Sequence, residues 1–442
     1  MTSMGGITLV LGAGASGLAA ARLLAHAGER VRLADEKSLP ALPEALGAVD
    51  CRVGAFDAAW LEGVTRVVVS PGVPPTSAAH RACAERGLPI SGELEEAFGR
   101  CAAPVLAVTG SNGKSTVTSL AAHLLQAQGR RAPAGGNLGR PLSDLLLDAP
   151  DADCYVVEVS SFQAETFRRF RPRAATLLNL SPDHLDRYGR LEDYYAAKLR
   201  TFAAMTAEDW LALGDDPAAG AHLADCPARR LAASPTRPLV ADGAGLVSGA
   251  LAIRWDGREH RLLPADDLPL PGRHNLANAL AALALVLPFG ADADALAEGL
   301  RSFRGLAHRM EDVGMLGALR CYNDSKATNV EAALAGVSGL SAPVLLIAGG
   351  RDKGGDFDAL AAGLPGVRLA YGIGEAGDKV ARAFGERGRE LGDLAAAVEA
   401  ARRDGRPGEL LVLSPACASY DQYRNFEERG EHFRRLVAEA SA

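Results

Sequence analysis

Two glycine-rich loops constrain the fold of this chain more than any other feature of its sequence. The first, GAGASG at residues 12–17, follows an apolar run at 7–11 and precedes an Ala/Leu-rich segment. The second, GSNGKST at residues 110–116, follows an apolar run at 105–109 and also opens an Ala/Leu-rich segment. A strand, a glycine turn and a helix in this order let backbone N–H groups converge on a phosphate. The chain is therefore predicted to bind nucleotide phosphates in two places.

Apolar runs alternate with helical segments along almost the whole sequence, which is the pattern of an α/β fold. A chain of 442 residues is too long for one core, and we predict three domains, at residues 1–95, 96–303 and 304–442. Residues 214–265, rich in Ala, Asp, Pro and Gly, are expected to form irregular or short antiparallel structure. The strands that we expect lie at 7–11, 31–34, 67–70, 105–109, 155–159, 175–178, 344–348 and 411–413.

Composition excludes several classes of protein. The net charge is −7, with acidic and basic residues mixed along the chain, which argues against nucleic acid as the main partner. Seven cysteines without a C-x-x-C pair predict reduced thiols and no structural zinc. The start, MTSMGG, does not resemble a secretory signal, and the apolar run at 276–287 is too short to span a bilayer. We expect a soluble cytoplasmic protein.

The first glycine loop is open to two interpretations. With Asp35 placed 18 residues after Gly17, it matches the fingerprint of an NAD-dependent oxidoreductase. Such an enzyme also needs a hydride-handling site, and the sequence offers no candidate. Because any nucleotide diphosphate fits a glycine turn at a helix N-terminus, the loop can instead hold a nucleotide-linked substrate.

The second loop has the chemistry of a P-loop. Lys114 can reach the β- and γ-phosphates of ATP, and the Ser115 hydroxyl can bind Mg²⁺. Val108 stands where a full Walker A motif has glycine, so the match is incomplete. The alternative, an ordinary strand–turn–helix connection, is disfavoured by the sequence Gly-Lys-Ser-Thr after an apolar strand.

Three further side chains follow predicted strands or lie on a predicted helix near this loop. Glu158 ends an apolar strand and is a candidate metal ligand, with a solvated strand-end charge as the alternative. His184, in a loop with Asp183 and Asp186, is either a metal ligand or a structural histidine. Lys198 lies among aromatic and apolar residues, where a snorkelling surface lysine is the plain interpretation.

Eight separate blocks of the sequence resemble, in order, the motifs of the Mur ligases, the ATP-dependent amino-acid-adding enzymes of peptidoglycan synthesis. They are TGSNGKST, GGNLGRP, EVSSFQ, LNLSPDHLDRY, AAKLR, GRHNLANALAA, HRME and NDSKATN. Within the family, SSFQ, NDSKATN and LSPACASYDQYRNFEERG resemble the branch that adds D-glutamate to UDP-N-acetylmuramoyl-L-alanine. The DNPR-like motif expected of the branch that adds diaminopimelate or lysine is absent.

The resemblance implies an N-terminal Rossmann-like domain that binds the UDP-linked substrate, a central P-loop ATPase-like domain and a C-terminal Rossmann-like domain that binds the amino acid. Asp35 would lie near the uracil, and Asn137 near the reacting centre. The residues implied in UDP-substrate binding are Gly14, Ala15, Ser16, Gly17, Asp35, Ser70, Pro71, Gly72 and Asn137.

For ATP, the family resemblance implies phosphate binding by the second loop and by Arg309, and adenine binding by Asn275 and Asn278. Asp324 and Lys326 would contact ribose and phosphate. The loop residues are Gly110, Ser111, Asn112, Gly113, Lys114, Ser115 and Thr116. Two Mg²⁺ ions are implied, and the residues implied in catalysis or metal binding are Lys114, Ser115, Glu158, His184 and Lys198, the last as a carbamate formed with CO₂.

The amino-acid site is implied in the last domain. Thr328 and Lys353 would bind the α-carboxylate of D-glutamate, and Ser419 and the backbone N–H of Phe426 the γ-carboxylate. Without the family, Lys353 is equally an exposed loop lysine. Cys417 is expected to be a small apolar filler and not a nucleophile. A site divided among three domains implies domain closure.

The implied reaction is amide-bond formation through an acyl phosphate. Apart from the resemblance, we expect a monomer with no nucleic-acid partner and no membrane insertion. Three alternatives stay open. The first is a sister ligase that adds another amino acid, or L-glutamate, to a related UDP-sugar or a folate-like acceptor. The second is the NAD-dependent oxidoreductase, and the third is a P-loop NTPase without amide chemistry.

Overall fold

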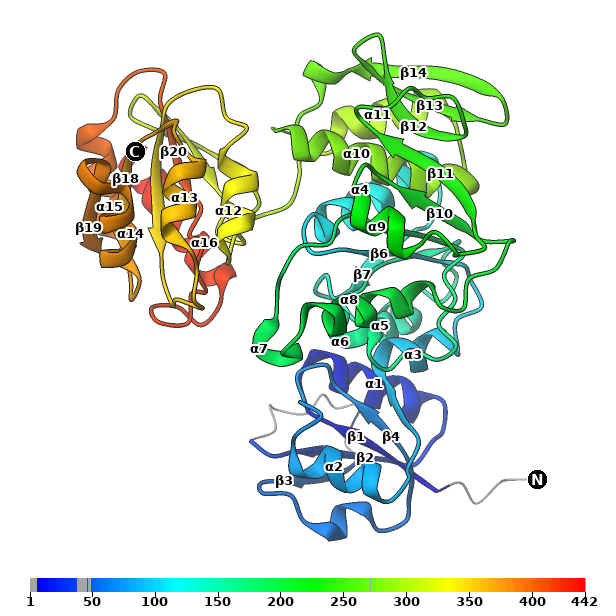
Figure 1. The fold of residues 1–442 in the computed structure, drawn as a ribbon. Helices are drawn as coiled ribbons and strands as arrows, with labels where there is room; N and C mark the ends of the chain where they lie inside the picture. Colours follow the sequence, from blue (N-terminus) through cyan, green and yellow to red (C-terminus); the bar gives the residue numbers. More distant parts are fainter. Residues whose placement is uncertain (1–5, 38–45, 47–48, 271, 442) are drawn as a thin grey trace. The chain divides into compact units, whose positions relative to one another are not determined.

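The structure is a computed structural model that describes residues 6–37, 46, 49–270 and 272–441 (Figure 1). The prediction that the chain has no secretory signal concerns residues 1–5, which lie outside the described residues. The chain divides into two compact units, one of Met1–Asp267 with Ala277–Ser302 and one of Leu268–Leu276 with Phe303–Ala442. The domain boundaries predicted at 95 and 303 remain predictions.

The first sheet begins the larger unit and has the strand order β3-β2-β1-β4-β5, with every pair parallel. Leu9 and Leu11 of β1 belong to one apolar cluster and Val10 to another, so this strand is buried on both faces of the sheet. This order is that of a doubly wound, Rossmann-like sheet. The elements are β1 Ile7–Leu11, α1 Ala15–His26, β2 Val31–Asp35, β3 Asp50–Val53, β4 Val64–Val69, α2 Ala78–Glu85, β5 Ile90–Gly92 and α3 Glu93–Phe98.

The second sheet has nine strands in the order β14-β13-β12-β11-β10-β9-β6-β8-β7. Its parallel part carries the second glycine loop at the end of β6, the central strand between β9 and β8. The elements of this part are β6 Val105–Thr109, α4 Lys114–Ala127, β7 Ala134–Gly136, α5 Leu142–Asp148, β8 Tyr155–Glu158, α6 Ser161–Ala164, β9 Ala174–Leu177, α7 Leu185–Tyr188, α8 Leu191–Leu199 and β10 Trp210–Leu213.

The segment expected to be irregular or antiparallel is more regular than predicted. It contains a helix and a strand, β11, that continues the parallel sheet beside β10. Only the last three strands, β12 to β14, form the expected antiparallel structure. These elements and those that follow them are α9 Pro217–His222, β11 Arg229–Ser234, β12 Gly243–Val247, β13 Ala250–Trp255, β14 Arg258–Pro264, α10 Arg273–Val286 and α11 Ala293–Ser302.

The smaller unit contains a six-stranded sheet in the order β15-β16-β20-β17-β18-β19, parallel except for β15. Alternate residues of β17 belong to two apolar clusters, so helices cover both faces of the sheet. Its elements are β15 Glu311–Leu316, β16 Leu319–Asn323, α12 Val330–Val337, β17 Val344–Gly349, α13 Phe357–Gly363, β18 Val367–Ile373, α14 Gly377–Phe384, β19 Gly388–Gly392, α15 Leu394–Asp404, β20 Leu410–Leu413 and α16 Phe426–Ser441.

All the strands expected from the sequence are present, and their ends differ from the predicted ends by at most three residues. The α/β fold with three parallel-rich sheets is therefore confirmed. Within the described residues, no helix combines the length and the apolar character needed to cross a membrane.

Inside the larger unit, polar contacts fix the first sheet against the second. The Arg22 guanidinium meets both carboxylate oxygens of Asp144 at 2.6 Å. Glu93, at the start of α3, accepts a hydrogen bond of 2.7 Å from the backbone N–H of Ser143 in α5. Glu95 accepts hydrogen bonds from two further backbone N–H groups, those of Arg169 and Phe170. These contacts hold the two glycine loops in one body.

Candidate active site

The first glycine loop is fixed by the ends of three neighbouring strands. A Cβ atom on Gly17 would lie 1.8 Å from the carbonyl oxygen of Gly12, so only glycine fits there. The Ser70 hydroxyl, after β4, donates to that same carbonyl at 2.8 Å. The Asp35 carboxylate, at the end of β2, accepts from the backbone N–H of Ala13 at 2.7 Å. The structure thus brings the loop, Asp35 and Ser70 close together, and their binding of a substrate stays a prediction.

The second glycine loop is closed by contacts of its own backbone. Gly113 has φ +84°, and a Cβ atom on it would lie 2.5 Å from the Asn278 side-chain oxygen. The Lys114 ammonium donates to the carbonyls of Gly110 and Ser111, both at 2.9 Å. The incomplete Walker match has a simple reason: Val108 lies within β6, fully buried, and the loop begins only at Gly110.

An oxygen cluster adjoins this loop. The Ser115 hydroxyl at the start of α4 donates to Oε2 of Glu158, and the Asn137 amide donates to Oε1 of Glu158 at 2.6 Å. A Cβ on Gly136 would lie 2.4 Å from the Glu158 carbonyl, which shows how closely the two strands approach. Glu158 is 2% exposed, so the alternative of a solvated strand-end charge is wrong. A hydroxyl and a carboxylate in contact are suitable ligands for Mg²⁺.

Lys198 is buried beside the loop, and the interpretation as a surface lysine is wrong. It is 2% exposed, and its Nζ donates to the carbonyl of Gly110 at 2.9 Å. It also lies 4.4 Å from the centre of the Tyr194 ring. Burial, and then the nearby Lys114 cation, lower the Lys198 pKa to about 6, against the opposing effects of Asp183 and Glu158. The amine is therefore mostly neutral at pH 7.

His184 follows β9 on the same side of the sheet. Its side chain is 43% exposed, which does not fit a histidine that is buried for structural reasons. The ring lies 4.8 Å from the Phe162 ring and 6.1 Å from that of Tyr194. The side chain of Asp186 lies outside the described residues. Where side chains are described, no three His, Cys, Asp or Glu residues form a metal cluster, so an ion here would need substrate or water ligands as well.

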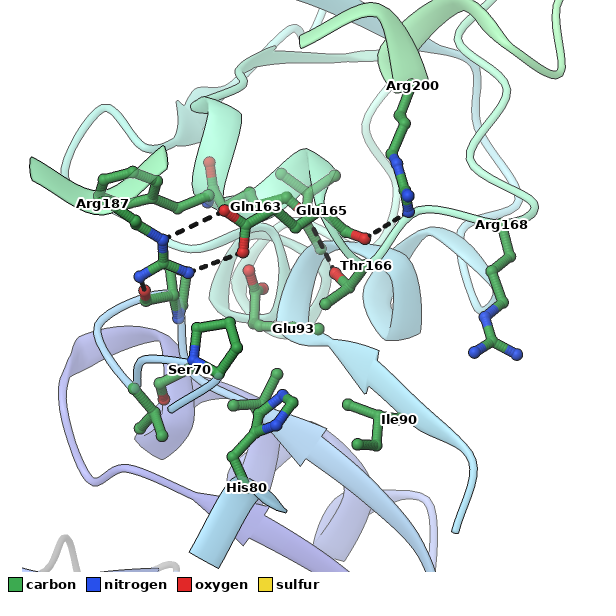
Figure 2. Close-up of a pocket in the computed structure, with 17 residues that line it drawn as sticks. Ser70, His80, Ile90, Glu93, Gln163, Glu165, Thr166, Arg168, Arg187 and Arg200 are labelled. Carbon is green, nitrogen blue, oxygen red and sulfur yellow. Dashed lines mark hydrogen bonds and ion pairs between the residues drawn. The ribbon is translucent and has the colours of Figure 1, made fainter. Parts of the chain in front are cut away.

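A pocket of about 240 Å³ lies between the first sheet and the segments that follow β8 and β9. Figure 2 shows Arg187 beside Glu165 on one side of this pocket and His80 and Ile90 on the other. Arg187 lies within the block LNLSPDHLDRY but is not among the predicted site residues. From the sequence alone, Arg187 cannot be distinguished from an arginine exposed on the surface.

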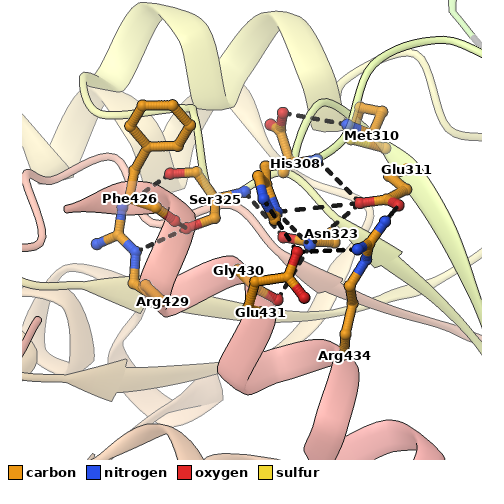
Figure 3. A network of polar contacts seen from close by, with 11 residues as sticks. His308, Met310, Glu311, Asn323, Ser325, Phe426, Arg429, Gly430, Glu431 and Arg434 are labelled. Atoms are coloured by element: carbon orange, nitrogen blue, oxygen red, sulfur yellow. Dashed lines mark hydrogen bonds and ion pairs between the residues drawn. The ribbon is translucent and has the colours of Figure 1, made fainter. Parts of the chain in front are cut away.

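In the smaller unit, a polar network connects His308, next to Arg309 in the sequence, with Glu311 and Asn323 (Figure 3). His308 and Met310, on either side of Arg309, have φ values of +62° and +44°, which non-glycine residues rarely adopt. The Asn323 amide contacts Nδ1 of His308 at 2.9 Å, and Met310 N–H donates to Asp324. Burial raises the Asp324 pKa to about 7. The network holds the backbone at Arg309 in one conformation.

A buried arginine, Arg429, contacts segments that adjoin some of the residues predicted for D-glutamate. The Arg429 guanidinium donates to the Ser325 hydroxyl at 2.9 Å and to the carbonyls of Ser325 and Cys417 at 2.8 and 3.1 Å. The Ser325 hydroxyl donates in turn to the Phe426 carbonyl. Arg429 thus joins the NDSKATN segment, the loop before Ser419 and the start of α16. Burial lowers its pKa only to about 10, so it stays charged at pH 7.

The other predicted residues of this unit occupy different environments. Lys326 lies 3.8 Å from the centre of the Phe426 ring. Lys353 is exposed in the loop after β17, and Arg351 in this loop donates its backbone N–H to Ala418, next to Ser419. Cys417 is buried, and burial raises its pKa to about 12, which fits an apolar filler. Thr328 is half-buried, and Asn275 is buried at the start of α10.

Comparison with known proteins assigns these features to one class. Three family models match the chain: the Mur ligase MurD-like N-terminal domain at residues 7–92, the Mur ligase middle domain at 108–286 and the Mur ligase glutamate ligase domain at 308–417. The chain belongs to the Mur ligase family.

Within this family, relatives of nearly equal length carry one name, UDP-N-acetylmuramoylalanine–D-glutamate ligase. That of Thermoanaerobacter pseudethanolicus is 37% identical over 98% of both chains. That of Pelotomaculum thermopropionicum is 40% identical over 97% of this chain and 96% of its own. The crystal structure of UDP-N-acetylmuramate-alanine ligase MurC from Thermotoga maritima has the same fold, with a TM-score of 0.61 and 17% identity over 99% of this chain and 100% of its own.

Proposed function

We propose that this chain is the ATP-dependent ligase that joins D-glutamate to UDP-N-acetylmuramoyl-L-alanine in peptidoglycan precursor synthesis. The observation that carries the proposal is the contact of Ser115 with Glu158 at the end of a P-loop, with the buried amine of Lys198 on the same loop. Relatives that are 37–40% identical over nearly the whole chain bear the name of that reaction. We also propose that the protein is a cytoplasmic monomer.

The reaction needs activation because a carboxylate is a poor electrophile. Transfer of the γ-phosphoryl group of ATP to the carboxylate of the L-Ala moiety gives an acyl phosphate and ADP. The neutral amine of D-glutamate then attacks the acyl carbon, and phosphate and a proton leave as the amide forms. The protein contributes mainly orientation and neutralisation of charge. Lys114 and the amides of the second loop would bind the phosphates, and Asn137 would orient the substrate carboxylate.

Ser115 and Glu158 would hold one Mg²⁺, and their oxygen atoms fit that ion. When bound, Mg²⁺ withdraws charge from the phosphate oxygens. His184 would hold a second ion through a ring nitrogen. The hydrogen bond from the Asn137 amide to Glu158 would keep that carboxylate oriented in the absence of substrate.

Lys198 would support the second ion as a carbamate. The neutral amine attacks CO₂, a C–N bond forms, one proton is released, and a neutral side chain becomes an anion. Burial of Lys198 and its low pKa favour this reaction, because only the neutral amine is a nucleophile. With ¹³C-labelled bicarbonate, a carbamate carbon resonance is expected for the native chain and not for Lys198→Arg. A native chain without that resonance would refute the carbamate and leave the ligase reaction standing.

Residues of the smaller unit would recognise the amino acid. Thr328 and Lys353 would bind the α-carboxylate of D-glutamate, and the Ser419 hydroxyl and the Phe426 N–H would bind the γ-carboxylate. The buried guanidinium of Arg429, in the same unit, adds a favourable electrostatic potential for an anionic ligand. For ATP, Asn275 and Asn278 would contact adenine, Arg309 the phosphates, and Asp324 and Lys326 the ribose and phosphate.

The test is phosphate release from ATP with UDP-N-acetylmuramoyl-L-alanine and Mg²⁺. D-Glu, L-Glu, L-Ala, L-Lys and meso-diaminopimelate are added separately, and turnover is expected with D-Glu alone. Turnover with another amino acid would keep the mechanism and overturn the assignment of Lys353 and Ser419. Phosphate release that depends on no amino acid would favour an NTPase. Titration with a fluorescent nicotinamide cofactor tests the oxidoreductase, and no signal is expected.

A further inference from the structure

One arginine in the larger unit, Arg187, connects its own helix to two other segments that are far apart in the sequence. Nε and Nη2 of Arg187 donate to the two carboxylate oxygens of Glu165, at 3.1 and 2.7 Å. Its Nη1 donates to the carbonyl of Pro71 at 3.2 Å. Its guanidinium carbon lies 4.2 Å from the centre of the Phe162 ring. Figure 2 shows this guanidinium between Glu165 and the segment that begins at Ser70.

Each of these segments carries a residue assigned to substrate or metal. Pro71 belongs to the Ser70–Gly72 segment proposed to bind the UDP-linked substrate. Glu165 directly follows α6, the helix after the strand that ends in Glu158. Arg187 lies in α7, three residues after His184, and the Phe162 ring contacts both the Arg187 guanidinium and the His184 ring. One guanidinium is therefore shared by the substrate segment and by both metal-bearing segments.

We propose that Arg187 is a positioning residue that couples binding of the UDP-linked substrate to binding of Mg²⁺ at His184. Movement of the Pro71 carbonyl when substrate enters is passed through the guanidinium to α7, and ordering of His184 by the ion is passed back. Such coupling is reciprocal, so each ligand strengthens the other by the same factor. The proposal rests on the proposed function, because it uses the substrate and metal assignments made there.

The geometry requires arginine and not merely a positive charge. A guanidinium is planar, offers several N–H donors in fixed directions and stacks on an aromatic ring, whereas an ammonium is a point charge. Arg187 uses all of these properties at once, with a side chain that is 17% exposed. Glu165 is itself held, because Arg200 donates to its backbone carbonyl at 2.7 Å. A lysine at position 187 keeps the charge and loses the simultaneous contacts.

The test is calorimetric titration of UDP-N-acetylmuramoyl-L-alanine into the full chain with a non-hydrolysable ATP analogue, at low and at saturating Mg²⁺. We expect Mg²⁺ to tighten substrate binding about tenfold in the native chain and less than about threefold in Arg187→Lys. Arg168→Lys is the matched control, because Arg168 lines the same pocket with an exposed side chain, and it should keep the native ratio. Glu165→Gln, which removes the partner carboxylate, should behave like Arg187→Lys.

A merely structural arginine would give a different result. Arg187→Lys would then lower the melting temperature and leave the Mg²⁺-dependent ratio of substrate affinities unchanged, and this outcome would overturn the proposal. The proposal would also be overturned if Mg²⁺ did not change the affinity of the native chain for the substrate. Neither result bears on the ligase reaction, because the titration needs no turnover and the phosphate-release assay on the native chain tests that reaction separately.

Discussion

The two glycine loops of the larger unit have the same backbone plan and different polar side chains around them. Each follows a buried parallel strand and opens a helix, α1 in one case and α4 in the other. The first loop is braced by an acid, because the Asp35 carboxylate accepts the N–H of Ala13. The second is braced by two lysines, because Lys114 and Lys198 both donate to the carbonyl of Gly110.

This difference separates what glycines determine from what their neighbours determine. Glycines allow the close turn, as Gly17 does against Gly12, and so they predict a shape that suits a diphosphate. A triphosphate with Mg²⁺ also needs cations and a metal ligand, which only the second loop has, in Lys114, Ser115 and Glu158. A carboxylate at the first loop suits an uncharged hydrogen-bond donor such as a base or a ribose hydroxyl.

The largest expected effect is on the chemistry of the second loop. Lys114→Ala removes the cation that would hold the phosphates, and we expect ATP turnover to fall roughly 10³-fold. Binding of the UDP-linked substrate should survive, because the first loop is intact. Phosphate release and substrate titration measure the two quantities separately. Simultaneous loss of both would contradict the assignment of different ligands to the two loops.

The next effect is on the shape of the first loop. Gly17→Ala places a Cβ 1.8 Å from a backbone oxygen that cannot move away, and we expect a loss on the order of 3 kcal/mol in the free energy of unfolding. Gly14→Ala is the matched control, because an added Cβ there meets nothing within 4 Å. Denaturant unfolding measures both variants. Equal losses in the two would mean that the turn is not as tight as the structure has it.

The sequence predicted these loops well because their determinants are local. The apolar strand, the glycines and the helix are consecutive, so the pattern alone places them. β11 was missed because its residues, RRLAAS, include no β-branched or aromatic side chain, and it is a strand only because β10 pairs with it. Arg187 and Arg429 were missed for a related reason. Each acts through contacts with distant segments, and from the sequence alone neither can be told from a surface arginine.

A smaller effect is expected at the acid of the first loop. Asp35→Ala removes the acceptor for the N–H of Ala13 and the group proposed near the uracil. We expect affinity for UDP-N-acetylmuramoyl-L-alanine to fall about tenfold, which corresponds to one charge-assisted hydrogen bond, and ATP affinity to stay unchanged. Titration with each ligand checks this. If ATP binding weakened and substrate binding did not, the ligands of the two loops would have to be exchanged.

The smallest effect concerns the contact that holds the two sheets together. Burial raises the pKa of Glu93 to about 7, above its ordinary value of 4.5, while its Oε1 accepts the Ser143 N–H at 2.7 Å. The folded chain therefore keeps a proton at Glu93 that the unfolded chain releases. The stability this gives is complete below pH 4.5 and is lost as the pH rises through about 7.

Glu93→Gln keeps the acceptor oxygen and removes the charge. We expect it to raise the melting temperature at pH 8 and to change it little at pH 5. Glu95→Gln is the contrasting variant, because both Glu95 oxygens accept backbone N–H groups and the amide would oppose one of them. It should lose stability at both pH values. An equal change at pH 5 and pH 8 for Glu93→Gln would mean that Glu93 does not titrate in this range, and the first loop would then be held against the second without a pH-dependent contact.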